Sequence, residues 1–440
     1  MKSNTISLEN KNHRFGGTVR AIASKSHAHR LLISAALSSS AVTMITPDSS
    51  KDIEATVNCL TGLGAEISRT SDSYFIKPIS PLGAVNSKNS ENSESTLSID
   101  SGESGSTLRF IIPVIGALGI NCDIFMHGRL SERPLSPMYE ELISHGLTMS
   151  PQGSNPLHIE GKLNGGTYTI AGNISSQFIT GLLFALPLIE EDSVLHVTGR
   201  LESRPYDDIT LKVLKDSRID IVETKARNSD TIFNIKGRQK YHCPDVVYAE
   251  GDWSNAAFFL SAGAIGDSPV TVTGLNIHSL QGDKKILSIL ESFGARVTMD
   301  ANQTSITVSP ANLHGTEIDA TDIPDLVPII SAVASVASGK TVIRNVERLR
   351  IKESDRVQTV VGTLSTLGAN IYEANDAIII HGIPSLRGGT VDSCNDHRIA
   401  MTSAIASIRC KEPVTITNCQ AVEKSYPGFY EDFQSLNGNP

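Results

Sequence analysis

The sequence predicts a mixed α/β protein made of about six similar units, and three observations lead to this prediction. A short polar motif, followed by a helix-length stretch rich in Ala, Ser, Ile and Leu, recurs at intervals of roughly 70 to 80 residues. Amphipathic helical patterns that end at a glycine lie between these stretches. Runs of alternating apolar and polar residues supply the strands. Three units per domain would give two similar domains.

The first kind of helix is expected to lie inside the protein. Its polar motifs begin at six positions, which are Ser24, Ser104, Ser175, Asp252, Asp325 and Asp396. Ser and Asp are preferred at helix N-termini, because their side chains accept hydrogen bonds from free backbone N–H groups. The stretches that follow are apolar or small on nearly every face, which is typical of buried helices.

The second kind of helix is amphipathic and leads into a strand. Apolar residues at helical spacing occupy one face of residues 286–293, and the pattern returns over residues 357–364. A glycine follows each pattern and is expected to cap the helix. Lys352 and Arg356 are four residues apart, so we expect them on one helical face at the start of the second of these helices.

Composition argues against several classes of protein. Lys and Arg number 38 against 47 Asp and Glu, and the formal net charge is -9 at pH 7, whereas broad nucleic-acid binding favours a basic face. The longest apolar runs reach about a dozen residues, short of the roughly 20 that a membrane span needs. The N-terminus lacks an apolar signal core. Six scattered cysteines show no metal-ligand spacing, so we expect a reduced, cytoplasmic protein without a metal. A polar stretch at residues 85–98 is expected to be a loop.

Several cations lie at the predicted helix starts. Lys25 lies at the first and Arg398 at the sixth. A helix N-terminus offers unpaired N–H groups and a positive dipole end, so it can hold a phosphate or a carboxylate. Glu353, beside Lys352 and three residues before Arg356, suits either an ion pair or a proton donor. The residues alone therefore indicate a two-domain enzyme or a binding protein for a small polyanion.

Short motifs follow one another along nearly the whole chain. They are Ser24-Lys25-Ser26 with Arg30, Gly105-Ser106-Thr107-Leu108-Arg109, Glu132-Arg133-Pro134, Ser175-Ser176-Gln177-Phe178, Arg204-Pro205-Tyr206, Gly251-Asp252, Ile323-Pro324-Asp325, Arg350-Ile351-Lys352-Glu353-Ser354-Asp355-Arg356, Asp396-His397-Arg398 and Lys424-Ser425. Each motif alone is weak, but their order and spacing are specific. Together they closely resemble the enolpyruvylshikimate-phosphate synthase family.

The resemblance implies a fold and a reaction. The fold would have two similar domains of three βαβαββ units each, one formed by residues 1–21 and 247–440 and the other, which binds shikimate phosphate, by residues 22–246. The activity would be that of a transferase in the shikimate pathway, which leads to chorismate and the aromatic amino acids. It would move the enolpyruvyl group of phosphoenolpyruvate to the 5-hydroxyl of shikimate 3-phosphate and release phosphate. No cofactor is implied, and a monomer is expected.

The resemblance also implies roles for individual residues. Asp325 would act as base toward the attacking hydroxyl, and Glu353 would protonate the methylene carbon and later help to remove that proton, with Lys25 as a further catalytic residue. Shikimate 3-phosphate would be held through its carboxylate by Ser26 and Arg30, through its phosphate by Ser175, Ser176 and Ser203, and through its ring or hydroxyls by Gln177, Tyr206, Asp325 and Lys352. Phosphoenolpyruvate would be held by Lys25, Gly105, Arg133, Arg356, Arg398 and Lys424.

Two alternative functions compete with this interpretation. A related enolpyruvyl transferase that acts on a nucleotide sugar uses a loop cysteine a few residues before an Arg-Pro pair, whereas this chain has Gly128 in that region and its nearest cysteine, Cys122, in a strand-like run. A non-catalytic polyanion-binding protein would need the cations but not the two carboxylates. Glu103 and Arg348 stand where many or some family members have Asn, so the hydrogen bonds of those asparagines are not carried over.

Overall fold

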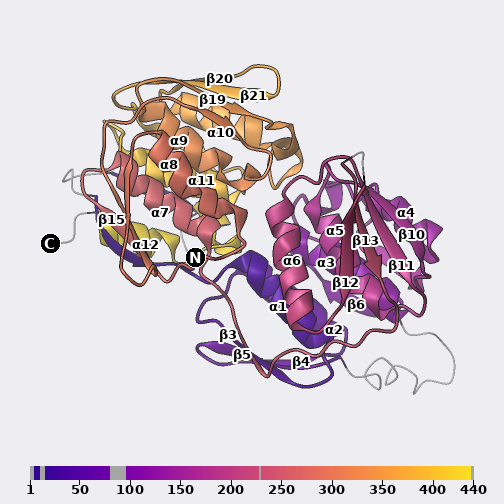
Figure 1. Cartoon of the computed structure of the whole chain (residues 1–440). Coiled ribbons are helices and arrows are strands. Elements are labelled where there is room, and N and C mark those ends of the chain that lie inside the picture. Colours follow the sequence, from indigo (N-terminus) through magenta and orange to yellow (C-terminus); the bar gives the residue numbers. More distant parts are fainter. Residues whose placement is uncertain (1–3, 10–14, 80–95, 227–228, 438–440) are drawn as a thin grey trace. The chain divides into compact units, whose positions relative to one another are not determined.

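The chain divides into two compact units. The computed structural model describes residues 4–9, 15–79, 96–226 and 229–437. One unit, here called the terminal unit, contains the residues up to Ser24 and those from Glu250 onward. The other, here called the inserted unit, runs from Lys25 to Ala249 and is coloured from indigo to magenta in Figure 1. No helix in the described ranges is both long enough and apolar enough for a membrane span.

The inserted unit contains three four-stranded sheets with one common strand order. In each sheet, taken in pairing order, the first two strands are parallel, and the third strand pairs antiparallel with both the second and the fourth. The pairing order in the first sheet is β14 (Val246–Tyr248), β3 (Val42–Ile45), β5 (Ser73–Lys77) and β4 (Glu66–Arg69). In the second sheet it is β6 (Leu97–Asp100), β7 (Cys122–Phe125), β9 (Leu157–Gly161) and β8 (Leu147–Met149). In the third sheet it is β10 (Gly166–Ala171), β11 (Ser193–Thr198), β13 (Thr231–Ile235) and β12 (Ile221–Lys225).

Two helices accompany each of these sheets. They are α1 (Lys25–Ala36) and α2 (Lys51–Gly62), α3 (Gly105–Leu118) and α4 (Met138–Ser144), and α5 (Ser176–Ala185) and α6 (Arg204–Asp216), with short 3-10 helices η2 (Leu130–Glu132) and η3 (Leu186–Leu188). Helices α3 and α5 pack closely, because a Cβ on Gly181 of α5 would lie 2.4 Å from the carbonyl oxygen of Arg109 on α3. Glycine at this position therefore permits the helix crossing.

The terminal unit repeats the same design. Its sheets have the orders β2 (Gly17–Arg20), β15 (Val270–Thr273), β17 (Ser305–Ser309) and β16 (Arg296–Met299); β18 (Glu317–Asp319), β19 (Gly339–Arg344), β21 (Ala377–Gly382) and β20 (Asn370–Glu373); and β22 (Gly389–Asp392), β23 (Val414–Thr417) and β1 (Thr5–Leu8). The last sheet has three strands, and in it β1 pairs antiparallel with β23, as the third strand in pairing order does in the other sheets. The predicted α/β fold of two similar three-repeat domains is confirmed.

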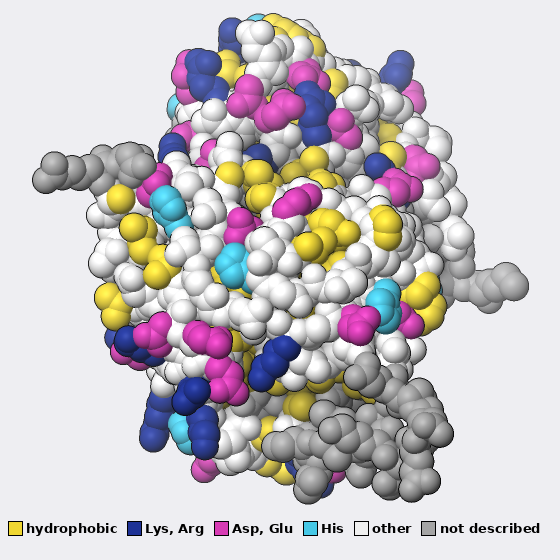
Figure 2. Space-filling view, turned by 90° about the vertical axis from the view of Figure 1, so that its right-hand side faces the viewer, with side chains coloured by type: hydrophobic (Ala, Val, Ile, Leu, Met, Phe, Trp, Pro, Cys, Tyr) yellow, Lys and Arg dark blue, Asp and Glu magenta, His cyan; other side chains and the backbone are white. Residues whose placement is uncertain are grey.

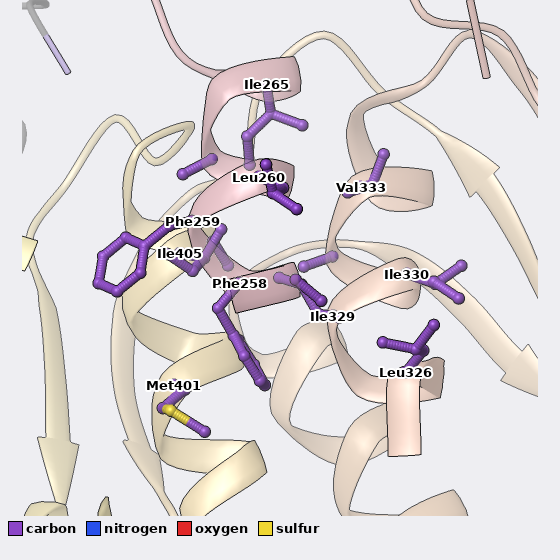
Figure 3. Close-up of a cluster of buried hydrophobic side chains, with 14 of the residues drawn as sticks. Phe258, Phe259, Leu260, Ile265, Leu326, Ile329, Ile330, Val333, Met401 and Ile405 are labelled. Atoms are coloured by element: carbon purple, nitrogen blue, oxygen red, sulfur yellow. The ribbon is translucent and has the colours of Figure 1, made fainter. Parts of the chain in front are cut away.

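Three buried helices form the centre of the terminal unit, and Figure 1 shows them side by side. The helices of this unit are α7 (Trp253–Ile265), α8 (Ile286–Ser292), α9 (Val327–Val336), α10 (Arg356–Thr366), α11 (His397–Ser407) and α12 (Phe429–Leu436). Phe258 of α7, Ile329 of α9 and Met401 of α11 converge in one apolar cluster (Figure 3). The prediction that the small and apolar helices are buried is confirmed. Their packing supplies the rigid base for the polar residues at their N-termini.

Most of the predicted helix starts are confirmed. Helix α1 begins directly after Ser24. The side chains of Ser104, Ser175, Asp252 and Asp396 each accept a hydrogen bond from a backbone N–H in the first turn of their helix. Asp325 is the exception, because it lies within the 3-10 helix η5 (Pro324–Leu326) and α9 begins only at Val327. Its carboxylate is occupied by ion pairs instead of capping a helix.

One local prediction is wrong, and a second is wrong at its C-terminal end. Lys352 and Arg356 do not share a helical face, because Lys352 follows the 3-10 helix η6 (Glu347–Ile351) in extended backbone and α10 begins only at Arg356. The two cations approach each other through a common partner, Asp325. Of the predicted loop 85–98, residues 85–95 lie outside the described residues and residues 97 and 98 belong to β6.

The surface shown in Figure 2 carries charges of both signs. Lys and Arg side chains lie among Asp and Glu side chains on this face and do not form one continuous field. A broad basic field is what nucleic-acid binding favours. This face therefore agrees with the acidic balance of the sequence.

Candidate active site

Arg356 is the centre of a buried ionic cluster in the terminal unit. Its side chain is 1% exposed, and it donates from Nε to Asp396 Oδ2 (2.8 Å), from Nη1 to Asp325 Oδ1 (2.7 Å) and from Nη2 to Glu353 Oε2 (2.5 Å). Burial would lower the pKa of Arg356, but Asp396, Glu353 and Asp325 outweigh it and raise the pKa above its usual value. One guanidinium thus holds three carboxylates, two of which are the predicted proton-transfer groups.

Asp325 is surrounded by cations. Arg398 donates from Nη2 to Asp325 Oδ2 (3.1 Å) and from Nη1 to the carbonyl oxygen of Asp325 (3.0 Å), and Lys352 Nζ lies 3.7 Å from Oδ1. Burial would raise the pKa of Asp325, but Arg398, Lys352 and Arg356 together hold it well below its usual value. Asp325 is therefore ionised at neutral pH in this structure.

The turn before α11 joins further predicted residues to this cluster. Lys424, at the end of the 3-10 helix η7 (Cys419–Lys424), donates from Nζ to the carbonyl oxygen of Asn395 (2.7 Å). Asp396 is the next residue and the N-cap of α11, so Lys424 is tied to the turn that carries a partner of Arg356. The terminal unit thus brings together Asp325, Lys352, Glu353, Arg356 and Arg398, with Lys424 bound to the adjoining turn.

A buried carboxyl that the sequence analysis missed lies next to this cluster. Asp283, on the 3-10 helix η4 (Gly282–Lys285), is buried. Burial raises the pKa of Asp283 to about 6, and the charge of Asp325 adds to this rise while Arg398 opposes it. No sequence signal marks Asp283, because its spacing from the predicted residues is long and irregular.

Helix α1 of the inserted unit presents Lys25 at its first position. Lys25 Nζ donates to Asp52 Oδ2 (2.8 Å) on the first turn of α2, and both side chains are largely buried. The backbone carbonyl of Ser26, the next residue on α1, accepts a hydrogen bond from Arg30 Nη1 (2.6 Å). Asp52 was not predicted, although it fixes the ammonium group of a predicted catalytic residue.

Arg30 links three helices of the inserted unit. It is buried and donates from Nε to Thr210 Oγ1 (2.8 Å) and from Nη2 to Thr180 Oγ1 (3.2 Å) and the carbonyl oxygen of Tyr206 (3.1 Å). Its guanidinium carbon lies 5.0 Å from the centre of the Phe110 ring. Burial lowers the pKa of Arg30 to about 10, which leaves it positively charged at neutral pH. Arg30 thus organises α1, α5 and α6, and its role toward a carboxylate stays a prediction.

Hydroxyl groups lie at the N-termini of α5 and α6. Ser175 Oγ caps α5 by accepting from the backbone N–H of Gln177 (3.2 Å), and Gln177 Nε2 donates to Ser106 Oγ (2.9 Å) on α3. Ser176 follows the cap and is buried. Ser203 lies directly before α6, with a left-handed backbone at φ 55°. The N-termini of α3 and α5 are therefore joined by a side-chain hydrogen bond.

The first residue of α3 is packed against two guanidinium groups. A Cβ on Gly105 would lie 2.4 Å from Arg133 Nη1 and 2.9 Å from Arg109 Nη1. Arg109 donates to the carbonyl oxygen of Gly105 (3.2 Å) and to that of Pro134 (3.1 Å), so it ties the start of α3 to the segment that carries Arg133. A Cβ at position 105 would have to displace the guanidinium of Arg133, so the observed arrangement suits glycine.

Comparison with known proteins identifies the family. The model of the family described as EPSP synthase (3-phosphoshikimate 1-carboxyvinyltransferase) matches residues 10–433. The chain belongs to the EPSP synthase family. A 3-phosphoshikimate 1-carboxyvinyltransferase of Clostridium kluyveri is 43% identical over 423 residues, which cover 96% of this chain and 95% of the relative. One from Clostridioides difficile is 42% identical over 427 residues, which cover 97% of this chain and 96% of the relative.

Solved structures agree with this membership of the EPSP synthase family at the level of the fold. An EPSP synthase from Acinetobacter baumannii superposes with a TM-score of 0.77 at 23% identity, over 99% of this chain and 98% of that one. The enolpyruvyl transferase NikO from Streptomyces tendae gives a TM-score of 0.73 at 16% identity, over 99% of this chain and 97% of that one. The resemblance and fold that the motifs predicted are confirmed.

Proposed function

We propose that this protein transfers the enolpyruvyl group of phosphoenolpyruvate to the 5-hydroxyl of shikimate 3-phosphate and releases phosphate. It would act as a monomer in the cytoplasm, in the pathway to chorismate and the aromatic amino acids. Within a family of 3-phosphoshikimate 1-carboxyvinyltransferases, the observation that carries this proposal is the pairing of Asp325 and Glu353 with one buried arginine. Anion binding alone would not require two carboxylates there.

The proposed substrates carry two phosphates and two carboxylates, and the chain offers groups of the matching kind. Hydroxyls at helix N-termini suit the phosphate of shikimate 3-phosphate. We assign Ser175, Ser176 and Ser203 to that phosphate, Ser26 and Arg30 to the carboxylate, and Gln177, Tyr206, Asp325 and Lys352 to the ring and its hydroxyls. Lys25, Gly105, Arg133, Arg356, Arg398 and Lys424 are assigned to phosphoenolpyruvate.

The electrostatics of Asp325 suggest how substrate binding could activate it. With a lowered pKa, the carboxylate is a weak proton acceptor in the ligand-free protein. A phosphate group that binds Arg356 and Arg398 would compensate their charges, so the pKa of Asp325 would rise toward its usual range. Asp325 would then accept the proton of the 5-hydroxyl more readily once phosphoenolpyruvate is present.

Proton transfer at the methylene carbon falls to Glu353. As the 5-hydroxyl oxygen bonds to the central carbon of phosphoenolpyruvate, Glu353 would donate a proton to the methylene carbon and a tetrahedral intermediate would form. The carboxylate would later take a proton back from that carbon while the bond to phosphate breaks. Arg356 lies 2.5 Å from Glu353, so it can stabilise the ionised carboxylate after donation.

Cys122 does not support the alternative of an enolpyruvyl transferase that acts on a nucleotide sugar. Cys122 is buried in β7, and burial, with a contribution from Asp123, raises the pKa of its thiol to about 12. A thiol of that kind is inert, whereas a reactive cysteine needs a lowered pKa and exposure.

Phosphate release tests the proposed function directly. The purified protein is incubated with phosphoenolpyruvate and either shikimate 3-phosphate or the nucleotide sugar, and inorganic phosphate is measured. Release is expected only with shikimate 3-phosphate, and Asp325→Asn serves as the control for a contaminating activity. The proposal would be disproved if phosphate were released only with the nucleotide sugar, or if it were released with neither of the two acceptors present.

Gly105→Ala is expected to weaken binding at the phosphoenolpyruvate site. The added methyl group would push the guanidinium of Arg133 away from α3, because it meets Nη1 at 2.4 Å. Glyphosate, which inhibits many members of the family at this site, should lose about 5- to 150-fold in affinity, as expected for an overpacking cost of about 1–3 kcal/mol. The Michaelis constant for phosphoenolpyruvate should rise less. Inhibition titrations at fixed shikimate 3-phosphate measure both effects.

The control for this prediction is Gly362→Ala. Gly362 lies on α10 with nothing within 4 Å of an added Cβ, so its substitution should leave both constants unchanged. If Gly105→Ala and Gly362→Ala gave the same inhibition constants, Gly105 would not border the inhibitor.

A further inference from the structure

A chain of buried hydrogen bonds leads from α1 across α2 to the N-terminus of α3. His29, one helical turn after Lys25, lies with Nδ1 2.7 Å from Thr56 Oγ1 on α2. Thr56 Oγ1 lies 2.6 Å from Thr107 Oγ1 on α3, and Thr107 Oγ1 donates to Ser104 Oγ (2.8 Å). All four side chains are buried. The reaction proposed above uses none of them.

Counting the hydroxyl protons shows which group is the donor in each of these hydrogen bonds. Each hydroxyl has one proton to donate. Thr107 gives its proton to Ser104 (2.8 Å), with the carbonyl oxygen of Asp52 as a more distant second acceptor (3.5 Å), so the bond between Thr56 and Thr107 uses the proton of Thr56. Thr56 then has no proton left for His29, and Nδ1 of His29 must be the donor to Thr56. The network therefore selects the tautomer of His29 that carries its proton on Nδ1.

The surroundings of His29 keep the ring neutral. Burial, followed by the charges of Lys25 and Arg30, holds the pKa of His29 well below its usual value. Its other nitrogen, Nε2, is buried and has no hydrogen-bond partner among the described residues, and the ring stands edge-on to Phe110 at 6.3 Å between centres. A neutral ring has a single N–H, and the hydroxyl chain uses it.

The hydrogen-bond chain ends at Ser104, at the start of α3. Ser104 is the N-cap of α3 and also accepts a hydrogen bond from the backbone N–H of Thr107 (3.3 Å). Gly105 is the next residue, and it lies against the guanidinium of Arg133. The chain therefore connects the helix that carries Lys25 to the helix start that carries Gly105.

We propose that His29 is a positioning residue, which donates from Nδ1 to Thr56, orients the hydroxyl chain through Thr107 to Ser104, and so holds the first turn of α3 beside α1. His29 itself would touch no substrate. The consequence for catalysis rests on the proposed function, since Lys25 and Gly105 are assigned to phosphoenolpyruvate there. Removal of the donor should affect the binding of that substrate more than the chemical step.

Substitution of His29 in the full chain tests the proposal. His29→Leu removes the donor and is expected to raise the Michaelis constant for phosphoenolpyruvate by about 5- to 10-fold, with a smaller change in kcat, as for loss of one buried hydrogen bond. His29→Asn keeps an N–H close to the place of Nδ1 and should rescue the constant to within about twofold of the wild type. Equal constants for His29→Leu and the wild type would overturn the proposal. So would an Asn variant no better than the Leu variant.

A second variant interrupts the hydrogen-bond chain between Thr56 and Ser104. Thr107→Val keeps the shape of the side chain but can neither accept from Thr56 nor donate to Ser104. If the hydrogen bonds from His29 to Ser104 act together, the double variant His29→Leu/Thr107→Val should raise the Michaelis constant for phosphoenolpyruvate little more than either change alone. Fold-changes that multiply in the double variant would show two independent effects and would overturn the proposal.

Hydrogen exchange in the ligand-free protein separates this proposal from the proposed function. The backbone N–H of Thr107 donates to Ser104 Oγ, so residues 105–107 should exchange faster in His29→Leu than in the wild type or in His29→Asn. This difference would support the positioning role even if shikimate 3-phosphate proved not to be the substrate. If exchange in His29→Leu equalled that of the wild type while the wild type turned over normally, the positioning role would be removed and the proposed function would stay intact.

Discussion

Glu353→Gln is expected to lower kcat by about 10²- to 10⁴-fold, the range that a positioned proton donor contributes. The amide has nearly the size of the carboxyl group, and its oxygen can still accept the hydrogen bond that Arg356 Nη2 donates to Glu353. The Arg356 cluster should therefore keep its shape, and only the transferable proton is lost. Phosphate release at saturating substrates measures kcat.

Binding of shikimate 3-phosphate to Glu353→Gln is expected to be nearly unchanged. Isothermal titration with that ligand measures it. The matched control is Glu373→Gln, which also removes a carboxylate paired with an arginine, Arg350, but lies outside the cluster. Turnover should survive in the control. Near-normal turnover in Glu353→Gln would remove Glu353 from the mechanism.

Local features of the fold could be predicted because they depend on neighbours in sequence. Ser104 and Asp396 cap the helices that their motifs predicted, since a cap bonds to residues two or three positions later. The amphipathic patterns before Gly294 and Gly368 became α8 and α10, and both glycines adopt the left-handed backbone expected after a helix.

Long-range pairing could not be predicted from the residues. The first sheet of the inserted unit takes its first strand, β14, from residues 246–248, and the first sheet of the terminal unit takes β2 from residues 17–20. A periodic pattern shows that a strand exists but not which sheet receives it. The same holds for ion pairs, since nothing near Asp52 in the sequence indicates Lys25 as its partner.

Asp325 shows how tertiary contacts can override a local rule. Its position in the repeat predicted a helix cap, but Arg356, Arg398 and Lys352 draw its carboxylate into the ionic cluster. A charged hydrogen bond to a buried guanidinium is stronger than a cap bond to a backbone N–H. The family resemblance assigned Asp325 a catalytic role, and its departure from the capping pattern agrees with that assignment.

Arg356→Met is expected to lower the free energy of unfolding of the terminal unit by about 3–5 kcal/mol, the cost of removing one partner from a buried ion pair. Asp396 is 0% exposed and would lose the guanidinium that bonds to both of its oxygens. The only tryptophan of the sequence, Trp253, is buried on α7 of the same unit. Its fluorescence during urea unfolding therefore reports on this unit.

Acid should reduce the difference between Arg356→Met and the wild type. Because the pKa of Asp325 is lowered in the folded protein, its contribution to stability is complete above its unfolded value of about 3.9 and is lost as the pH falls toward the lowered one. The difference should therefore be full at pH 7 and shrink in strongly acid solution. Arg350→Met is the control, since Arg350 is 25% exposed and forms its ion pairs with Glu347, Asp355 and Glu373 at the surface, and should contribute only about 0–1 kcal/mol. Equal losses in the two variants at pH 7 would contradict the view that burial makes the Arg356 cluster costly to break.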